Sequence, residues 1–191
     1  MPVGVVYEMG GMYQQQQIAF RGLIIVLGAA VALVFLLLLF LYERFRVALA
    51  ILATPLLCIS AVFVGLWTAG LELNISALMG MTMIVGIATE VAIFYFSEFQ
   101  GLVGMDAVGT AVRRQALVQA GKNRMRPIAM TTAAAILTLL PLAFAIGRGS
   151  AMQQPLAVAI VSGLLVQLPV TLLVMPVLFD RMQQRSAAGR S

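Results

Sequence analysis

Five long apolar stretches fill most of this chain, and they leave few folds open to it. Each stretch holds 21 to 24 residues, and they span residues 20–41, 47–69, 75–97, 127–147 and 156–179. A helix of that length extends roughly 32–36 Å at 1.5 Å per residue, which is enough to cross a hydrocarbon core of about 30 Å. We therefore predict an all-α membrane protein, built as a five-helix transmembrane bundle.

The composition agrees with a membrane bundle and excludes several kinds of site. The chain has 191 residues, of which 62% are hydrophobic, and a mean hydropathy of +1.03, whereas soluble domains are usually less than half apolar. It contains no His, and its one cysteine, Cys58, lies in an apolar stretch, where we expect it to be packed. Catalysis by imidazole and metal sites made by cysteine pairs are therefore excluded. We predict no enzyme activity, no cofactor, no metal site and no nucleic-acid partner.

The positions of Lys and Arg predict how the chain crosses the membrane. Two basic residues, Arg21 and Arg148, fall on one side, and ten fall on the other: Arg44, Arg46, Arg113, Arg114, Lys122, Arg124, Arg126, Arg181, Arg185 and Arg190. Cytoplasmic segments are enriched in Lys and Arg, so the side with ten is predicted to be cytoplasmic. The N-terminus would then lie outside the cytoplasm and the C-terminus inside it, in a multi-pass membrane protein.

These spans divide the chain into five segments. Residues 1–19 form an extracytoplasmic tail, residues 20–97 hold the first three helices, residues 98–126 are a cytoplasmic connection, residues 127–179 hold the last two helices, and residues 180–191 are a cytoplasmic tail. The connection is predicted to contain an amphipathic helix that lies on the membrane, begins at Asp106 and ends at Gly121. One face of this helix carries Val108, Val112, Ala116 and Ala120.

The third apolar stretch carries an acidic residue, Glu90, deep inside it. Insertion scales put a mid-helix Asp at roughly 2.5–3.5 kcal/mol, so such residues are kept where they pair, face a water-filled cavity or relay protons. Small and polar residues recur at helical spacing along the same stretch, at Thr82, Gly86, Thr89 and Ser97. Because a lipid-facing surface needs none of these, we predict that Thr82, Gly86 and Thr89 pack against another helix and that Glu90 is directed into the bundle. The alternative is that Glu90 only bonds a neighbouring helix.

The fourth stretch brings a hydroxyl close to the predicted depth of Glu90. Pro127 suits the start of a helix, where its missing N–H is not needed, and Thr131 follows one turn later. Counted from the cytoplasmic ends of their helices, Thr131 and Glu90 differ in depth by roughly 4–5 Å, which is within one turn. A contact between the hydroxyl and the carboxylate, direct or through water, is one interpretation. A bond from Thr131 to its own helix backbone is the other.

Several runs of this sequence, in fixed order and spacing, resemble the C-terminal membrane part of resistance–nodulation–division (RND) efflux pumps. They are Pro2 to Gln17, Gly80 to Glu90, Arg124-Met-Arg-Pro-Ile-Ala-Met-Thr131, Leu140-Pro141-Leu142, Gly147-Arg-Gly149-Ser150, Pro155-Leu-Ala, Ser162-Gly163 and Met175-Pro176-Val-Leu-Phe179. The resemblance implies a membrane domain of twelve helices in two repeats, large periplasmic domains and a homotrimer. This chain would supply the eighth to twelfth helices, as a fragment, a split gene product or a truncated remnant.

The resemblance also implies roles for single residues. Glu90 stands where drug pumps of the family typically place a relay lysine and where metal exporters can have a glutamate, although Ile128 stands where metal exporters can carry a lysine. Thr131 and Arg124 match the relay-associated threonine and arginine of the family. The implied function is proton-driven export of drugs, metals or other small molecules, with Glu90, Thr131 and Arg124 in the proton relay.

The resemblance implies a location and partners as well. The location is the bacterial inner membrane, with the N-terminus periplasmic and the C-terminus cytoplasmic. The partners are the lipid bilayer, the missing first-repeat half, a periplasmic adaptor and an outer-membrane channel. Two alternatives remain open at this point: a non-transporting membrane scaffold or remnant of such a pump, and a protein-export helper of the same superfamily.

Overall fold

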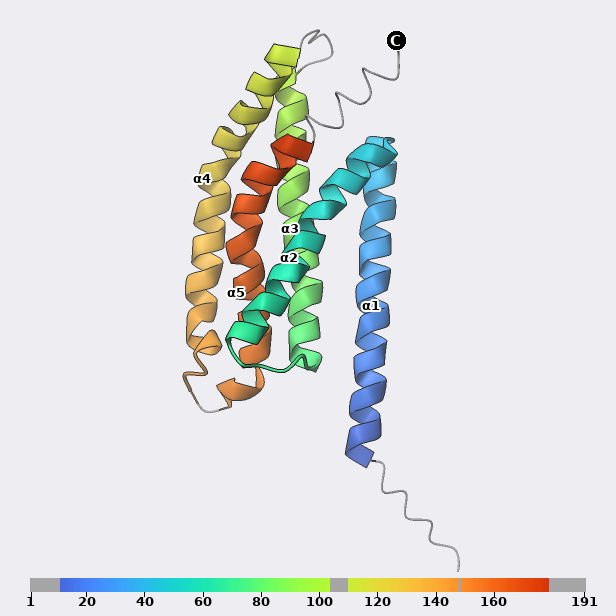
Figure 1. Ribbon diagram of the computed structural model, residues 1–191, viewed down its shortest axis with the longest axis vertical. Coiled ribbons are helices and arrows are strands. Elements are labelled where there is room, and N and C mark those ends of the chain that lie inside the picture. Colours follow the sequence, from blue (N-terminus) through green and yellow to red (C-terminus); the bar gives the residue numbers. More distant parts are fainter. Residues whose placement is uncertain (1–10, 104–109, 148, 179–191) are drawn as a thin grey trace, which may run out of the picture.

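The computed structural model describes residues 11–103, 110–147 and 149–178, and each predicted span is a helix in it (Figure 1). The helices are α1 (Gly11–Tyr42), α2 (Phe45–Thr68), α3 (Ile75–Val103), α4 (Thr110–Ala143) and α5 (Gln154–Pro169). A short 3-10 helix, η1 (Ser150–Met152), precedes α5, and a π-helical turn, η2 (Val170–Val174), follows it. Five helices, the last continuing to Leu178, are long and apolar enough to cross a membrane. The predicted all-α, five-span fold is confirmed.

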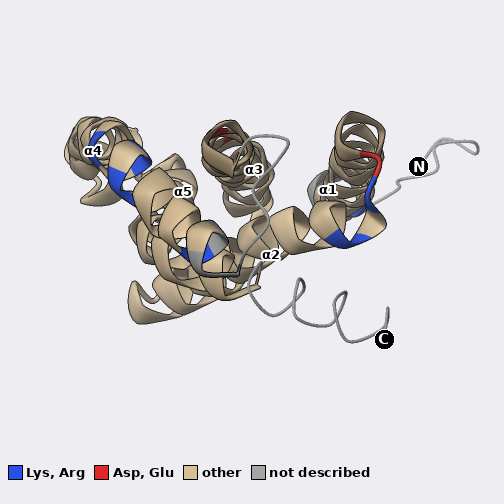
Figure 2. Cartoon of the chain, turned by 90° about the horizontal axis from the view of Figure 1, so that it is seen from above, with Lys and Arg blue, Asp and Glu red and all other residues tan. Residues whose placement is uncertain are grey.

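The helices alternate in direction, so the bundle has two chemically different ends (Figure 1). At one end α1 leads into α2 through Arg44, α3 finishes and α4 begins with its basic N-terminal half. Seen from above, the basic residues lie on α4 and around the junction of α1 and α2 (Figure 2). We call this the basic end. The other end, called the far end, carries the loop 70–74 and the described residues 144–147 that follow α4. Which end faces the cytoplasm stays a prediction.

α3 is the central helix, because it packs against α1, α2, α4 and α5. α1 lies at the edge of the bundle (Figures 1 and 2), and Leu38 is its fully buried side chain among the described residues. Aromatic contacts tie α1 to the bundle at the basic end, where the rings of Tyr42 and Phe96 meet edge to face at 4.7 Å between centroids. The apolar surface that α1 leaves exposed suits lipid.

The buried apolar side chains form two cores, one above the other along the bundle. The basic-end core includes Ile51, Ala92, Tyr95, Leu117 and Met175. The far core is built by these buried residues: Cys58, Val62, Leu66, Ala77, Leu78, Met81, Ile84, Ala88, Ala159, Ile160 and Leu164. Cys58 is packed in this core, as its position in an apolar stretch predicted.

Glycines bring α5 into close contact with its neighbours in the far core. A Cβ added at Gly163 would overlap the side chain of Ile84, and one added at Gly80 would lie 2.8 Å from Cβ of Ala159. A Cβ at Gly65 of α2 would likewise overlap Ser162. Without a strong hydrophobic force between helices in lipid, such small residues allow the backbone approach that gives packing energy. Close packing of α5 against α2 and α3 therefore explains why small residues stand at Ser162 and Gly163.

The predicted helix of the 98–126 connection was wrong in its boundaries. α4 runs without interruption from Thr110 to Ala143, so Gly121 does not end a helix and Pro127 lies inside one. Gly121 costs about 1 kcal/mol relative to Ala in a helix, but breaking the helix would leave several backbone groups unpaired. Pro127 has no N–H to donate to the carbonyl of Asn123, and its ring crowds that carbonyl, yet the helix continues through it.

The predicted apolar face of that connection is half correct. Ala116 and Ala120 are buried in the basic-end core, so this part of α4 packs against protein rather than lying on the membrane. Val112 is exposed, and Asp106 and Val108 lie outside the described residues. The small side chains that looked like one half of an amphipathic helix are in fact helix-packing residues.

Candidate functional site

Glu90 lies on a face of α3 that the other described helices leave uncovered. From Met79 to Ser97 the exposed residues of α3 recur every three or four positions, and we call them the open face: Met79, Met83, Gly86, Glu90, Phe94 and Ser97. A Cβ added at Gly86 would meet nothing within 4 Å. In the view from above, α3 stands between α4 and α1 with its side away from α2 uncovered (Figure 2). The open face is a continuous stripe with a carboxylate near its middle.

The structure divides the stripe that the sequence presented as one surface. Thr89 is buried, and its hydroxyl donates to the Val85 carbonyl at 2.7 Å. Thr82 is half-buried and donates to the Leu78 carbonyl at 2.9 Å. Gly86 and Glu90 lie on the open face instead. The expectation that Glu90 points into the bundle of this chain was therefore wrong, because the stripe straddles the boundary between the covered and uncovered sides of α3.

Thr131 is exposed on α4 and bonds its own helix. Its Oγ1 lies 3.1 Å from the Pro127 carbonyl and 3.0 Å from the Ile128 carbonyl. No hydrogen bond joins Thr131 to Glu90 in the part of the chain that the structure describes. Of the two interpretations of the sequence, backbone bonding is the one observed, because a carbonyl one turn back is always within reach of a helical threonine.

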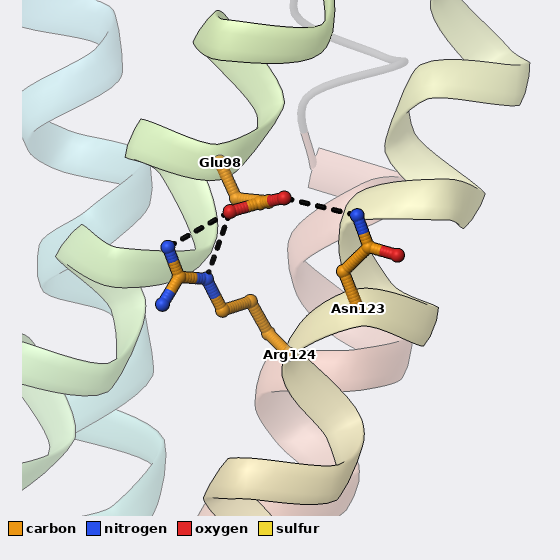
Figure 3. Close-up of polar contacts among 3 residues, drawn as sticks. All are labelled: Glu98, Asn123 and Arg124. Carbon is orange, nitrogen blue, oxygen red and sulfur yellow. Dashed lines mark hydrogen bonds and ion pairs between the residues drawn. The ribbon is translucent and has the colours of Figure 1, made fainter.

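Arg124 pairs with an acidic residue that the sequence reasoning passed over, Glu98 of α3 (Figure 3). The Nε and Nη2 atoms of Arg124 donate to Glu98 Oε2 at 3.1 and 2.8 Å. Asn123 Nδ2 donates to Glu98 Oε1 at 2.9 Å and itself accepts from Gln119 Nε2 at 2.9 Å. The Arg124 guanidinium also lies 5.7 Å from the ring centroid of Phe94. This network fastens α3 to α4 at the basic end.

A sequence signal for the Glu98–Arg124 pair existed. Glu98 directly follows the third apolar stretch, and Arg124 lies three residues before the fourth. Consecutive spans are usually neighbours and antiparallel, so charges at the same membrane boundary tend to meet. Tyr95 adds a second link between these helices, since its hydroxyl donates to the Leu117 carbonyl at 2.9 Å. Glu98 therefore has partners in α4, whereas the carboxylate of Glu90 is presented on the open face.

On the open face the Glu90 carboxylate is not covered by another described helix, so a role in proton transfer requires a further helix to pack there. Glu90 is the charged group of the open face, whose other members are apolar, small or hydroxyl-bearing. Exposed directly to lipid, a carboxylate is unfavourable, so the face is suited to a helix that brings a polar or charged partner. A carboxylate in such an interface can take up and release a proton as its partners change.

Comparison with known proteins places this chain among transporters. Residues 1–183 match the model of the AcrB/AcrD/AcrF family. The chain is 31% identical over 180 residues to the swarming motility protein SwrC of Bacillus subtilis (strain 168). The aligned region covers 94% of this chain and 17% of SwrC. It is also 31% identical to the cobalt-zinc-cadmium resistance protein CzcA of Cupriavidus metallidurans, over 94% of this chain and 16% of CzcA.

A solved structure agrees in fold. The crystal structure of a heavy metal efflux pump superposes with a TM-score of 0.77 at 31% identity, covering 95% of this chain and 18% of the pump. A second crystal form of a heavy metal efflux pump gives the same TM-score, 0.77, over 91% of this chain. The chain thus spans less than a fifth of the length of these relatives, 16–18% of each.

Proposed function

The chain belongs to the AcrB/AcrD/AcrF family of RND efflux pumps, and from that premise we propose that it is the second-repeat membrane segment of a proton-driven exporter. Protons crossing the membrane bundle would drive conformational cycling of the periplasmic part of the pump, which moves the substrate. The proposal covers a whole pump, of which this chain is the portion that carries Glu90.

We propose a divalent metal cation as the substrate class. The support is the likeness to a cobalt-zinc-cadmium resistance protein and to heavy metal efflux pumps. Glu90 also supports a metal substrate, because metal exporters of the family can have a glutamate at this position. Ile128 departs from that pattern, because metal exporters can carry a lysine there, and drugs remain the competing substrate class for the transport test below.

The observation that carries the proposal is the open face of α3 with Glu90 in it. The first-repeat half of the pump would cover this face, and the open space above Gly86 would admit its backbone at close range. In that interface Glu90 would load and release protons beside groups of the first repeat. Thr131, exposed on α4, would contribute its hydroxyl to the same network, and Arg124 would mark its edge at the basic end.

Substitution of Glu90 in the full-length pump tests this assignment. We expect Glu90→Gln to abolish or strongly reduce metal export against an imposed pH gradient, because it removes the titratable group while keeping its shape. Glu90→Asp should retain part of the activity. The matched control is Glu72→Gln, the same substitution in the exposed far-end loop. Wild-type export by the Glu90→Gln pump, with trimer content unchanged, would leave the carboxylate a structural role and would end the relay proposal.

The export assay also separates this function from its alternatives. A non-transporting scaffold or remnant would show no gradient-dependent export in the full-length context, and a protein-export helper would support secretion rather than metal or drug resistance. If drugs rather than metals are exported, the relay proposal stands and the substrate class fails. The inner membrane, the homotrimer, the periplasmic adaptor and the outer-membrane channel are the setting we propose for the intact pump.

Orientation can be tested with the same protein. We propose that the basic end is cytoplasmic, since Lys and Arg are concentrated in cytoplasmic segments. In a background with Cys58→Ala, a cysteine placed at Glu72 should react with an impermeant thiol reagent added to intact spheroplasts. A cysteine placed at Arg44 should react only after the membrane is opened. The reverse pattern would invert the topology.

A further inference from the structure

Buried polar side chains separate the two cores of the bundle at one level. The buried polar residues of the described chain are Thr54, Thr89, Thr132, Gln167 and Thr171, which we call the polar layer. On α2, Thr54 lies between Ile51 of the basic-end core and Cys58 of the far core. On α3, Thr89 lies between Ala88 of the far core and Ala92 of the basic-end core. On α4, Thr132 lies between Ala120 of the basic-end core and Ala135, which packs against the far core. The layer therefore crosses the middle of the bundle.

On the last helix the polar layer coincides with the change of helix type. Gln167 and Thr171 lie between Leu164 of the far core and Met175 of the basic-end core. Thr171 belongs to the π turn, where the Met175 N–H donates to the Val170 carbonyl five residues back. This turn packs against both α2 and α3. π turns inside α-helices are frequently found at functional sites.

Three polar atoms of this layer have no hydrogen-bond partner among the described residues: Thr54 Oγ1, Gln167 Oε1 and Thr171 Oγ1. Their side chains are at least nine-tenths buried, with 1% of Thr54 and 0% of Gln167 and Thr171 exposed. The neighbouring polar atoms are paired, since Gln167 Nε2 donates to the Ile87 carbonyl at 3.4 Å. Buried polar atoms are almost always paired with protein or with ordered water.

The backbone adds an acceptor at the same level. Pro55, next to Thr54, has no N–H to donate to the carbonyl of Ile51 one turn earlier. Ile51 is fully buried. In membrane helices, carbonyls freed by proline are satisfied by neighbouring side chains or by ordered water.

We propose that the polar layer is an internal binding site for water within the bundle. Its unpaired groups are two hydroxyls and an amide oxygen, which offer both donors and acceptors, and none of its five residues is charged. A neutral ligand that donates and accepts matches this set, because a buried water typically makes about three hydrogen bonds to otherwise unpaired groups. A cation would lack compensating charge within the layer. The site does not depend on the proposed transport.

Water-to-protein magnetisation transfer in solid-state NMR tests the site in the full-length protein, reconstituted in lipid bilayers with labelled Thr, Gln and Ala. We expect side-chain signals of Thr54, Gln167 and Thr171 to build up from water several-fold faster than the methyl signals of Ala92 and Ala159. These two alanines are fully buried in the cores on either side of the layer. Build-up at the layer as slow as at the two alanines would mean a dry layer and would overturn the proposal.

Substitutions then test whether the three groups share the water. Thr171→Val removes one hydroxyl with little change of shape, and it should slow the transfer to Gln167 at least twofold. The matched control is Thr138→Val, because the Thr138 hydroxyl is exposed and donates to the Ala134 carbonyl of its own helix. Unchanged transfer to Gln167 in the Thr171→Val protein would show that the hydroxyl holds no shared water. If the Thr171→Val protein does not fold, the wild-type comparison of the layer's side-chain signals with those of Ala92 and Ala159 still shows whether the layer holds water.

Discussion

The two faces of α3 are built from similar residues and have opposite surroundings. On the covered face, Gly80 and Ile84 lie against α5 so closely that an added Cβ at Gly80 or Gly163 would collide. On the open face, Gly86 meets nothing within 4 Å and Glu90 is exposed. A small residue in a membrane helix therefore marks a place where a helix can approach, but does not say whether that helix belongs to the same chain. The open face is the surface that we propose the first-repeat half of the pump to cover.

The largest expected difference between the two faces comes from enlarging their glycines. Gly163→Leu should destabilise the bundle by about 3 kcal/mol or more, the upper end for overpacking, because its side chain must displace Ile84. Gly86→Leu should not destabilise this segment and should stabilise it by up to about 1 kcal/mol, because Leu is a better helix former than Gly and meets no neighbour there. Reversible unfolding in mixed micelles measures both. Equal destabilisation would mean that the faces are not different in packing.

Gly86→Leu sharpens the comparison further in the full-length pump. If the first repeat covers the open face, the added side chain should reduce export even though the segment itself is folded normally. Normal export with Leu at this position would show that no helix approaches Gly86 closely.

A pair of methionines two residues apart gives the next largest contrast. Met81 is 1% exposed in the far core, whereas Met83 on the open face is 52% exposed. Met81→Ala should cost about 2 kcal/mol, the lower end for truncation of a buried side chain, since the lost dispersion contacts leave a cavity. Met83→Ala should be close to neutral, because lipid or detergent chains fill the space. The same unfolding assay checks both, and a larger cost at Met83 would contradict the assignment of the faces.

Loss of one interhelical hydrogen bond should have a smaller effect. Tyr95→Phe leaves the ring in the basic-end core and removes the donor to the Leu117 carbonyl. We expect a destabilisation of about 1 kcal/mol, typical of a single hydrogen bond. Amide hydrogen exchange around Leu117 should rise in parallel. No change in either quantity would show that this bond does not hold α3 and α4 together.

The ion pair at the basic end should contribute least. Glu98 and Arg124 are 25% and 34% exposed, so solvent screens their attraction. A double-mutant cycle with Glu98→Gln and Arg124→Gln should give the smallest coupling of these tests, as is usual for accessible ion pairs, and the coupling should fall as salt is raised. A strong coupling that does not change with salt concentration would instead show that solvent does not reach the pair.

The sequence predicted the number of helices well, because apolar length and lipid thickness leave little choice. It did not predict their lengths, since α1, α3 and α4 have 32, 29 and 34 residues and extend beyond the apolar stretches. It did not predict the boundaries of the 98–126 connection. Gly121 and Pro127 were read as a helix end and a helix start, whereas α4 passes through both. Local turn signals lose to tertiary packing here, because Ala116, Leu117 and Ala120 of this part of α4 are buried in the basic-end core.

The candidate site shows the same division between local pattern and three-dimensional packing. Sequence alone singled out Glu90, because an ionisable group inside an apolar stretch is conspicuous, and it singled out Arg124 through a resemblance. It missed Glu98, whose importance comes from a partner 26 positions away. It also missed the polar layer, since a threonine in an apolar helix looks the same whether its hydroxyl is paired or not.

By itself, the sequence determined that this protein is a five-helix membrane segment with one acid in the middle of a span. Those properties follow from hydrophobicity and from helix rise, and both act along the chain. Only the tertiary structure decided which side of α3 is covered, and hence that Glu90 and Gly86 lie on the open face while Thr89 is buried. Burial depends on which neighbours pack against a helix, and periodicity fixes the angle between two residues on that helix but not the direction in which they point.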